Sequence, residues 1–178
     1  MTIRRARAMD LEGLNRLLYQ VEDVHRQGRP DLFKLHEKKY TDEELLALID
    51  ADAEAFAPLS RAYSLPKDTP DRAEILENCL RQAASAPKKI ADACCAVIEL
   101  AEGCAACGSR LVLSDAATAA ALARGALKGA VINVKVNTTL MHDRAYADTL
   151  AAEMAEKERE YTARADAVCD AVAVSLGF

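Results

Sequence analysis

The chain has 178 residues but no tryptophan, and aromatic residues make up only 4% of it. Abundant alanine and leucine with so few aromatic side chains favour helices packed through small residues over a β-sandwich. No apolar run approaches the ~20 residues that a membrane span needs, and no apolar core follows the arginine-rich start as it would in a signal peptide. We therefore expect a cytoplasmic protein that does not contact a membrane.

Glycine and metal ligands are also scarce. The seven glycines are never adjacent, the three histidines are scattered, and the one C-x-x-C motif is Cys104 to Cys107. Because zinc would need two further ligands, we predict no metal site. The net charge of −5 argues against a general nucleic-acid binder.

The composition that is present, 51% hydrophobic, is enough for one domain with or without an appendage. Residues 1–40 carry nine Lys and Arg against six Asp and Glu, whereas the remainder carries fourteen against twenty-two. We predict a mainly all-α protein, an antiparallel helical bundle with a short N-terminal βα appendage. The predicted domains are residues 1–42 and 43–178.

A long helix of small residues is predicted from Ser114 to about Met141. Ser114 is the expected N-cap, and Asp115 lies in the first turn, where the helix dipole favours a carboxylate. Alanine and glycine let neighbouring helices approach closely, so we expect this helix to be the most buried element and the centre of the bundle.

One stripe of this helix carries polar groups among small residues: Asp115, Thr118, Leu122, Ala126, Gly129, Asn133 and Asn137. We expect this stripe to be the packed face and Arg124, Lys128 and Lys135 to face solvent. Buried polar groups must satisfy one another or surround a polar ligand, because each costs roughly 1–3 kcal/mol unpaired. At 1.5 Å per residue Asp115 and Asn133 are about 27 Å apart, so either a second protomer joins them or they hold separate ends of an extended ligand.

An earlier helix begins at the capping box that Thr41 opens. We expect its packed stripe to contain Leu45, Leu48, Ile49, Asp52, Phe56, Leu59 and Tyr63. The Asp52 carboxylate would then point inward and need a partner. Lys67 lies in the turn that follows, as a candidate for binding an anionic group or as an ordinary solvated lysine.

The first forty residues predict a strand at Thr2 to Ala6 and an amphipathic helix from Asp10 to Gln27. This stretch resembles the first strand and helix of a GNAT-type acetyltransferase. That family binds acetyl-CoA with a [QR]-x-x-G-x-[GA] loop, which is absent from this chain. An acetyltransferase fragment is therefore kept only as an alternative.

Four motifs in the rest of the chain resemble the cyclodeaminase/cyclohydrolase family, the C-terminal domain of formiminotransferase-cyclodeaminase, over residues 43–175. They are D-A-E-A-F from Asp52, L-P-K-D from Leu65, S-D-A from Ser114 and N-V-K-V-N from Asn133. The resemblance implies a helical homodimer that acts on a tetrahydrofolate derivative, without a metal. It implies either closure of the 5-formimino form to the 5,10-methenyl form or hydrolysis of the methenyl form.

The same resemblance and the stripe pattern together suggest the site residues. The predicted catalytic residues are Asp52 and Asp115, and the predicted substrate-binding residues are Lys67, Ser114, Asn133 and Asn137. The family's Pro-Gly-Gly-Gly-Ser loop has no counterpart here, so catalysis is expected to be impaired. A non-catalytic helical dimerisation module is the alternative.

Overall fold

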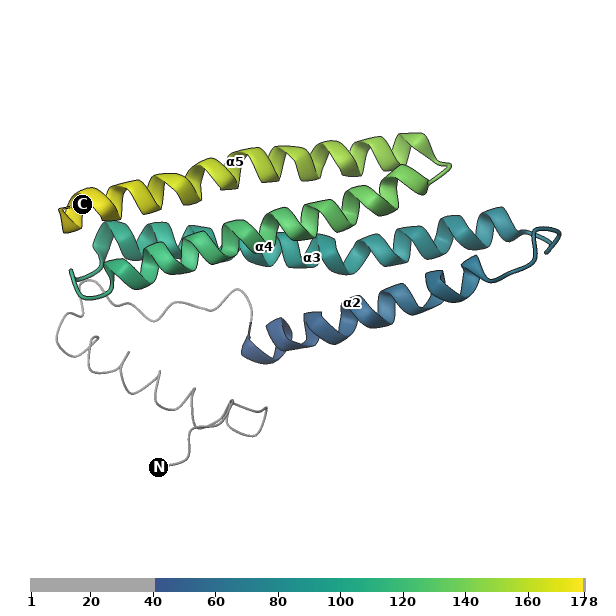
Figure 1. Ribbon diagram of the computed structural model, residues 1–178, viewed down its shortest axis with the longest axis horizontal. Helices are drawn as coiled ribbons and strands as arrows, with labels where there is room; N and C mark the ends of the chain where they lie inside the picture. The colour runs from purple at the N-terminus through teal and green to yellow at the C-terminus, as the bar shows by residue number, and fades with distance from the viewer. Residues whose placement is uncertain (1–40, 178) are drawn as a thin grey trace, which may run out of the picture. The chain divides into compact units, whose positions relative to one another are not determined.

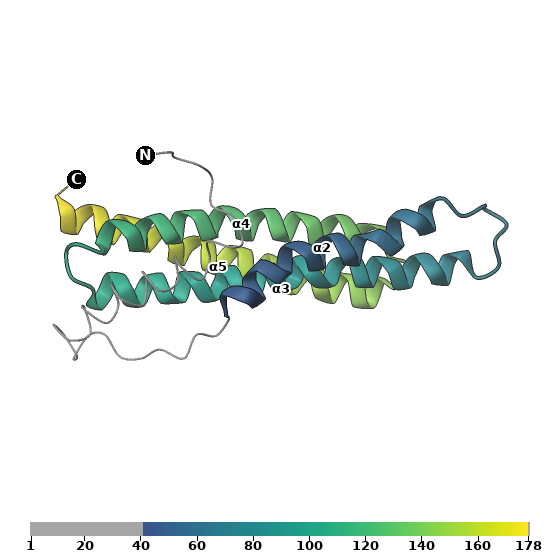
Figure 2. The same cartoon turned by 90° about the horizontal axis from the view of Figure 1, so that it is seen from below.

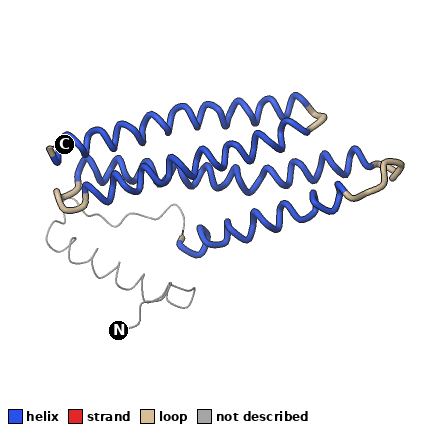
Figure 3. Tube along the Cα trace, viewed as in Figure 1, coloured by secondary structure: helices blue, strands red, loops and turns tan. Residues whose placement is uncertain are grey.

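The computed structural model describes residues 41–177, and the predicted N-terminal strand and helix lie outside this range. The described part is helical and contains no strand, as Figures 1 and 3 show. Its elements are α2 Asp42–Tyr63, α3 Arg72–Cys107, α4 Leu113–Leu140 and α5 Arg144–Leu176. The helical bundle predicted from the sequence is confirmed for these residues.

The central helix is α3, which packs against each of the other three helices. Helix α4 packs on α3 and α5, whereas α2 packs on α3 alone among the described helices. Figure 2 shows that the four helices run along roughly the same direction. The prediction that the helix after Ser114 forms the centre is therefore wrong. The largest fully buried side chains are Leu59, Ile98, Leu127, Val131, Val134, Met154 and Pro87.

Local hydrogen bonds define two helix starts, and the sequence predicts the first of them. Thr41 forms the expected capping box, since its Oγ1 accepts from the Glu44 amide at 3.1 Å while Glu44 Oε2 accepts from the Thr41 amide at 2.7 Å. At the start of α5, Asp143 Oδ1 accepts from the Tyr146 amide at 3.1 Å. These caps satisfy amides that the first helical turn leaves without intrahelical partners.

The start of α4 differs from the prediction, because its N-cap is Val112 rather than Ser114. The Val112 amide already donates to the Ser109 carbonyl at 3.0 Å, so the chain turns before Ser114 is reached. Gly108 makes this turn possible: a Cβ there would lie 2.3 Å from the Cys104 carbonyl oxygen. Ser114 thus lies in the first turn, where its carbonyl accepts from Thr118 Oγ1 at 2.8 Å.

Two cysteines of α3 behave as small apolar residues. Cys94 and Cys95 belong to the core on α3. Burial raises the pKa of the Cys95 thiol to about 11, so it stays protonated at neutral pH.

Ion pairs join α3 to α5 along the surface of the bundle. Arg164 donates to Glu102 through Nε at 2.8 Å and through Nη2 at 2.5 Å. These hydrogen bonds hold the pKa of Glu102 below its ordinary value of 4.5. Because the folded-state pKa is the lower one, the stabilisation is fully present above pH 4.5 and is lost as the pH falls through the folded-state pKa.

We expect Arg164→Gln to lower the free energy of unfolding by about 0.5–1 kcal/mol at pH 7, since the pair is exposed enough for solvent to screen it. This difference in unfolding free energy should vanish at an acid pH at which Glu102 is protonated in the folded chain. Urea denaturation at both pH values measures this. Arg159→Gln is the matched control, because Arg159 pairs with Glu156 of its own helix α5, so this ion pair does not join two helices. An equal loss at acid pH would contradict an electrostatic origin.

Candidate functional site

The predicted polar stripe of α4 lies on the side that none of the described helices α2, α3 and α5 covers. Ser114, Asp115 and Asn133 are exposed, and Asn137 is half-buried. The buried side consists instead of Leu113, Ala116, Ala120, Ala123, Leu127, Ala130, Val131, Val134 and Thr138. The predicted orientation of α4 is therefore wrong. Leu127, Val131 and Val134 are fully buried on one side of α4, and they decide which side is packed because they bury much apolar area.

The basic residues predicted for solvent lie against α5 instead. Arg124 Nε is 3.0 Å from Asp166 Oδ1, and Lys135 Nζ donates to Glu158 Oε2 at 2.9 Å. Their side chains are half-buried as a result. The polar stripe was expected to be packed but is largely exposed. The basic stripe was expected to face solvent but lies against α5.

Gly125 and Gly129 lie on this same side of α4, which the other described helices leave open. Both are exposed, and a Cβ built on either would meet no atom within 4 Å. Large apolar side chains lie near them, with Leu122 71% exposed and Ile132 58% exposed. A glycine inside a helix costs about 1 kcal/mol relative to alanine, and nothing in the described part of the chain requires one at either position.

The predicted site residues of α4 form two separate groups on that side. Ser114 and Asp115 lie in the first turn, whereas Asn133 and Asn137 lie close to the other end, where Asn137 Nδ2 donates to the Asn133 carbonyl at 2.9 Å. The helix between them spans about 27 Å. One copy of α4 does not bring the two groups together.

The remaining predicted residues belong to α2 and the turn after it. The buried side of α2 is Ala55, Leu59 and Ala62, so Asp52 is half-buried at its edge rather than pointing inward. Ile49 and Phe56 of the predicted stripe are exposed. Small alanines allow α2 to approach α3 closely, which explains why they replace the larger residues there. Lys67 is exposed in the turn.

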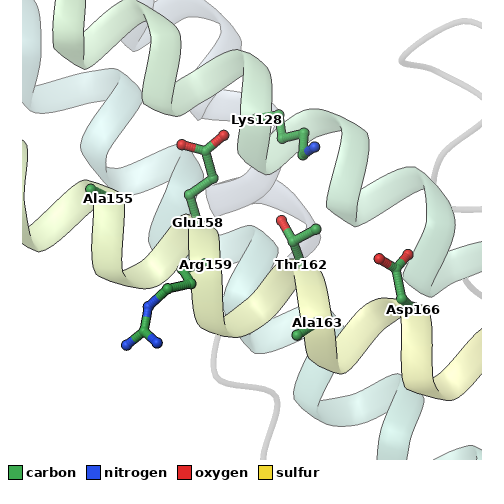
Figure 4. A pocket seen from close by; sticks show the side chains of 7 residues that line it. All are labelled: Lys128, Ala155, Glu158, Arg159, Thr162, Ala163 and Asp166. Atoms are coloured by element: carbon green, nitrogen blue, oxygen red, sulfur yellow. The ribbon is translucent and has the colours of Figure 1, made fainter.

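A shallow groove of about 380 Å³ lies between α4 and α5. Figure 4 shows the side chains that line it: Lys128, Ala155, Glu158, Arg159, Thr162, Ala163 and Asp166. It contains none of the predicted site residues, and no sequence motif indicated it. Its two acidic side chains, Glu158 and Asp166, already pair with Lys135 and Arg124, so the groove offers no free carboxylate to a ligand.

Two further features concern metals and membranes. Among residues 41–177, no three His, Cys, Asp or Glu side chains gather as a metal site would require. In the same range, none of the helices has both the length and the apolarity of a membrane span.

A sequence profile of the formiminotransferase-cyclodeaminase family matches residues 18–156. A methenyltetrahydrofolate cyclohydrolase of Methylorubrum extorquens is 38% identical over 108 residues, which is 58% of this chain and 52% of that protein. A formimidoyltransferase-cyclodeaminase of Mus musculus is 38% identical over 104 residues, which is 56% of this chain and 19% of that protein. The chain therefore spans about half the length of the first relative and about a fifth of the second.

A formiminotetrahydrofolate cyclodeaminase of Thermotoga maritima has a similar solved structure, with a TM-score of 0.54 and 24% sequence identity. The similarity covers 79% of this chain and 74% of that protein. At this identity the similarity establishes the helical fold alone.

Proposed function

This chain belongs to the formiminotransferase-cyclodeaminase family, and on that premise we propose that it handles one-carbon units carried by tetrahydrofolate. One observation carries the proposal: the family match over residues 18–156 spans all six predicted site residues. The reaction would be closure of 5-formimino-tetrahydrofolate to the 5,10-methenyl form with loss of ammonia. The alternative within the same chemistry is hydrolysis of the methenyl form to 10-formyl-tetrahydrofolate.

Both reactions pass through a tetrahedral carbon between two nitrogens. In the closure, one nitrogen attacks the formimino carbon and ammonia leaves, so a proton must reach the departing nitrogen. In the hydrolysis, water adds to the methenyl carbon, gives up a proton, and one carbon–nitrogen bond breaks. A carboxylate within hydrogen-bonding reach performs these transfers, and this is the role proposed for Asp115 and Asp52.

The exposure of the site residues supports this assignment. Asp115 is open to solvent at the first turn of α4, where a ligand can reach its carboxylate. The Asn133 carboxamide offers two N–H donors and an acceptor, and Asn137 offers its acceptor and the N–H that is not bonded to the Asn133 carbonyl. Such groups suit the edge of a pterin ring, and Ser114 adds a hydroxyl. Lys67, exposed in the turn after α2, would bind the negatively charged glutamate tail as a point charge.

Turnover is expected to be slow. Glycine clusters let backbone amides approach a planar or anionic ligand without side chains in the way, and this chain has no two adjacent glycines. A reacting group displaced by about 1 Å can reduce the rate by about 10²-fold. We therefore expect the chain to fold normally although its folate turnover is slow.

Calorimetry with a tetrahydrofolate derivative tests the proposal on the purified chain. We expect binding, together with loss of methenyl-tetrahydrofolate absorbance well below an ordinary enzymatic rate. Acetyl-CoA serves as the control ligand and should give no heat of binding. Binding of acetyl-CoA without binding of folate would contradict the proposal and favour an acetyltransferase fragment.

A second candidate function is a non-catalytic dimerisation module. The uncovered apolar side of α4 favours it, because such a surface serves association whether or not a ligand binds. Absence of folate binding by a well-folded chain would support this candidate.

A further inference from the structure

The last turn of α3 brings two cysteines together. Cys104 and Cys107 are three residues apart, and α3 ends at Cys107. Both are exposed in the described part of the chain, whereas the other four cysteines are buried or half-buried. Neither belongs to a predicted site or to a family motif. No other two cysteines among the described residues are both open to a reagent in solution.

The spacing of this pair comes close to what a disulfide needs. In an α-helix the Cα atoms of residues i and i+3 are about 5 Å apart, within the roughly 4.4–6.8 Å range of disulfides. The Cβ atoms are about 5–6 Å apart, whereas a disulfide needs roughly 3.5–4.5 Å. Tightening the turn to 3₁₀ geometry brings them together, because side chains at i and i+3 eclipse there. The pair can therefore close by a small local change.

The end of a helix can make this change. The Gly108 amide donates to the Cys104 carbonyl at 2.7 Å, which closes the last α-helical turn. In a 3₁₀ turn the Cys104 carbonyl accepts from the Cys107 amide instead. Gly103 is exposed and Gly108 half-buried, so water can reach the backbone groups that lose a partner. The tightening therefore stays within the last turn of α3.

The Cys104 thiol is affected by its neighbour. Although the residue is exposed, its sulfur atom is partly covered, and this desolvation raises the pKa of the thiol. The nearby Cys107 raises the same pKa further, in agreement with the close spacing of the two sulfur atoms. Because Cys104 holds its proton at neutral pH, we assign the first attack on an oxidant to Cys107.

We propose that Cys104 and Cys107 form a reversible intramolecular disulfide by exchange with a low-molecular-weight disulfide such as oxidised glutathione. The Cys107 thiolate attacks one glutathione sulfur, and the other glutathione leaves as a thiolate. The Cys104 thiol then gives its proton to water and attacks the Cys107 sulfur, which expels the second glutathione. Overall, two protein thiols lose two electrons and two protons, and one oxidised glutathione becomes two reduced glutathiones.

The surroundings of the pair favour a labile bond over a structural one. Exposure lets a reducing thiol reach the disulfide, and exposed disulfides that distort their backbone are the readily reduced ones. The closed loop contains only Ala105 and Ala106 between the cysteines. So short a loop restricts the unfolded chain little, and the bond therefore adds little stability.

The disulfide would also act on the proposed folate site, in a step that rests on the proposed function. Residues 108–112 connect α3 to α4, and Ser114 and Asp115 follow in the first turn of α4. Closing the disulfide releases the Gly108 amide at the start of this connection. Because a displacement of about 1 Å in a reacting group can reduce the rate by about 10²-fold, we expect slower folate turnover in the oxidised chain.

Mass spectrometry of the full chain in glutathione buffers tests the disulfide. Cleavage after Glu102 and Arg110 isolates a peptide that contains Cys104 and Cys107 and none of the other four cysteines. After alkylation of free thiols, this peptide should carry two alkyl groups in reduced glutathione. In oxidised glutathione it should carry none and lack the mass of two hydrogen atoms. Excess reduced glutathione should restore both thiols.

The matched control is the exchange of two neighbours, Ala106→Cys with Cys107→Ala. It keeps two cysteines at exposed positions, but positions 104 and 106 face different sides of the helix. The ratio of intramolecular disulfide to mixed glutathione disulfide should fall by at least about tenfold. Circular dichroism checks that both chains keep their helices. A native pair that stays reduced or carries two glutathiones, or a control that closes as readily, would overturn the proposal.

Hydrogen exchange tests the effect on the connection without any folate. Oxidation should speed exchange of the Gly108 amide by at least about tenfold, because its bond to the Cys104 carbonyl is given up. The double variant Cys104→Ser with Cys107→Ser should show no dependence on glutathione. Unchanged exchange in a fully oxidised chain would overturn the coupling to the site. Changed exchange without folate turnover in either state would instead contradict the proposed function and leave the disulfide standing.

Discussion

Leu127→Ala should lower the free energy of unfolding of the helical unit by about 2–5 kcal/mol. Leu127 is fully buried in the middle of α4, within the core that α3, α4 and α5 share. Its truncation removes apolar burial and leaves a cavity that long, continuous helices cannot easily close. Chemical denaturation monitored by circular dichroism measures the loss.

Leu122→Ala is the matched control, with the same substitution in the same helix on the exposed side. We expect a change below about 0.5 kcal/mol in the free energy of unfolding at concentrations where the chain is monomeric. If Leu122→Ala lowered the stability of the monomer as much as Leu127→Ala, the orientation of α4 would be the reverse of the one described.

Asp115→Asn should reduce whatever folate turnover the native chain shows by about 10²–10⁴-fold, the usual contribution of a positioned general acid or base. The carboxamide keeps the shape of the side chain but cannot accept the proton that the reaction transfers. Folate binding by calorimetry should change far less than the rate, because the substitution removes proton transfer and keeps a polar group in place.

The control for this variant is Asp148→Asn. Asp148 is also an exposed aspartate in the first turns of a helix, but it pairs with Arg144 on α5 and lies outside every predicted motif. The Asp148→Asn chain should show the same rate of folate turnover as the native chain. Equal rates for native chain and Asp115→Asn would exclude Asp115 as the proton-transfer group and leave Asp52 for that role.

The sequence predicted best the features that depend on a few neighbouring residues. The capping box at Thr41 consists of local hydrogen bonds, so its residue pattern is enough to predict it. The family motifs likewise indicated the helical fold over most of the chain. These features do not depend on which elements meet in space.

The orientation of α4 could not be predicted in the same way. Alanine and glycine occur on every side of this helix, so small residues do not identify the packed side. The informative signal was the position of Leu127, Val131 and Val134, the large aliphatic residues that share one side. The predicted stripe contained a single large aliphatic residue, Leu122. Packing it against α3 would have buried its polar groups and little apolar area.

Among the described helices α2 packs on α3 alone, so we expect α2 to open at a lower free energy than the other three helices. Helices α3, α4 and α5 each contact both of the others, whereas α2 can detach without breaking any contact among those three. In native-state hydrogen exchange, such a helix behaves as a separate cooperative unit whose opening free energy is below that of the whole unit. Since α2 carries Asp52, a ligand held by that carboxylate would slow exchange throughout α2, and the site would be complete only while α2 is docked.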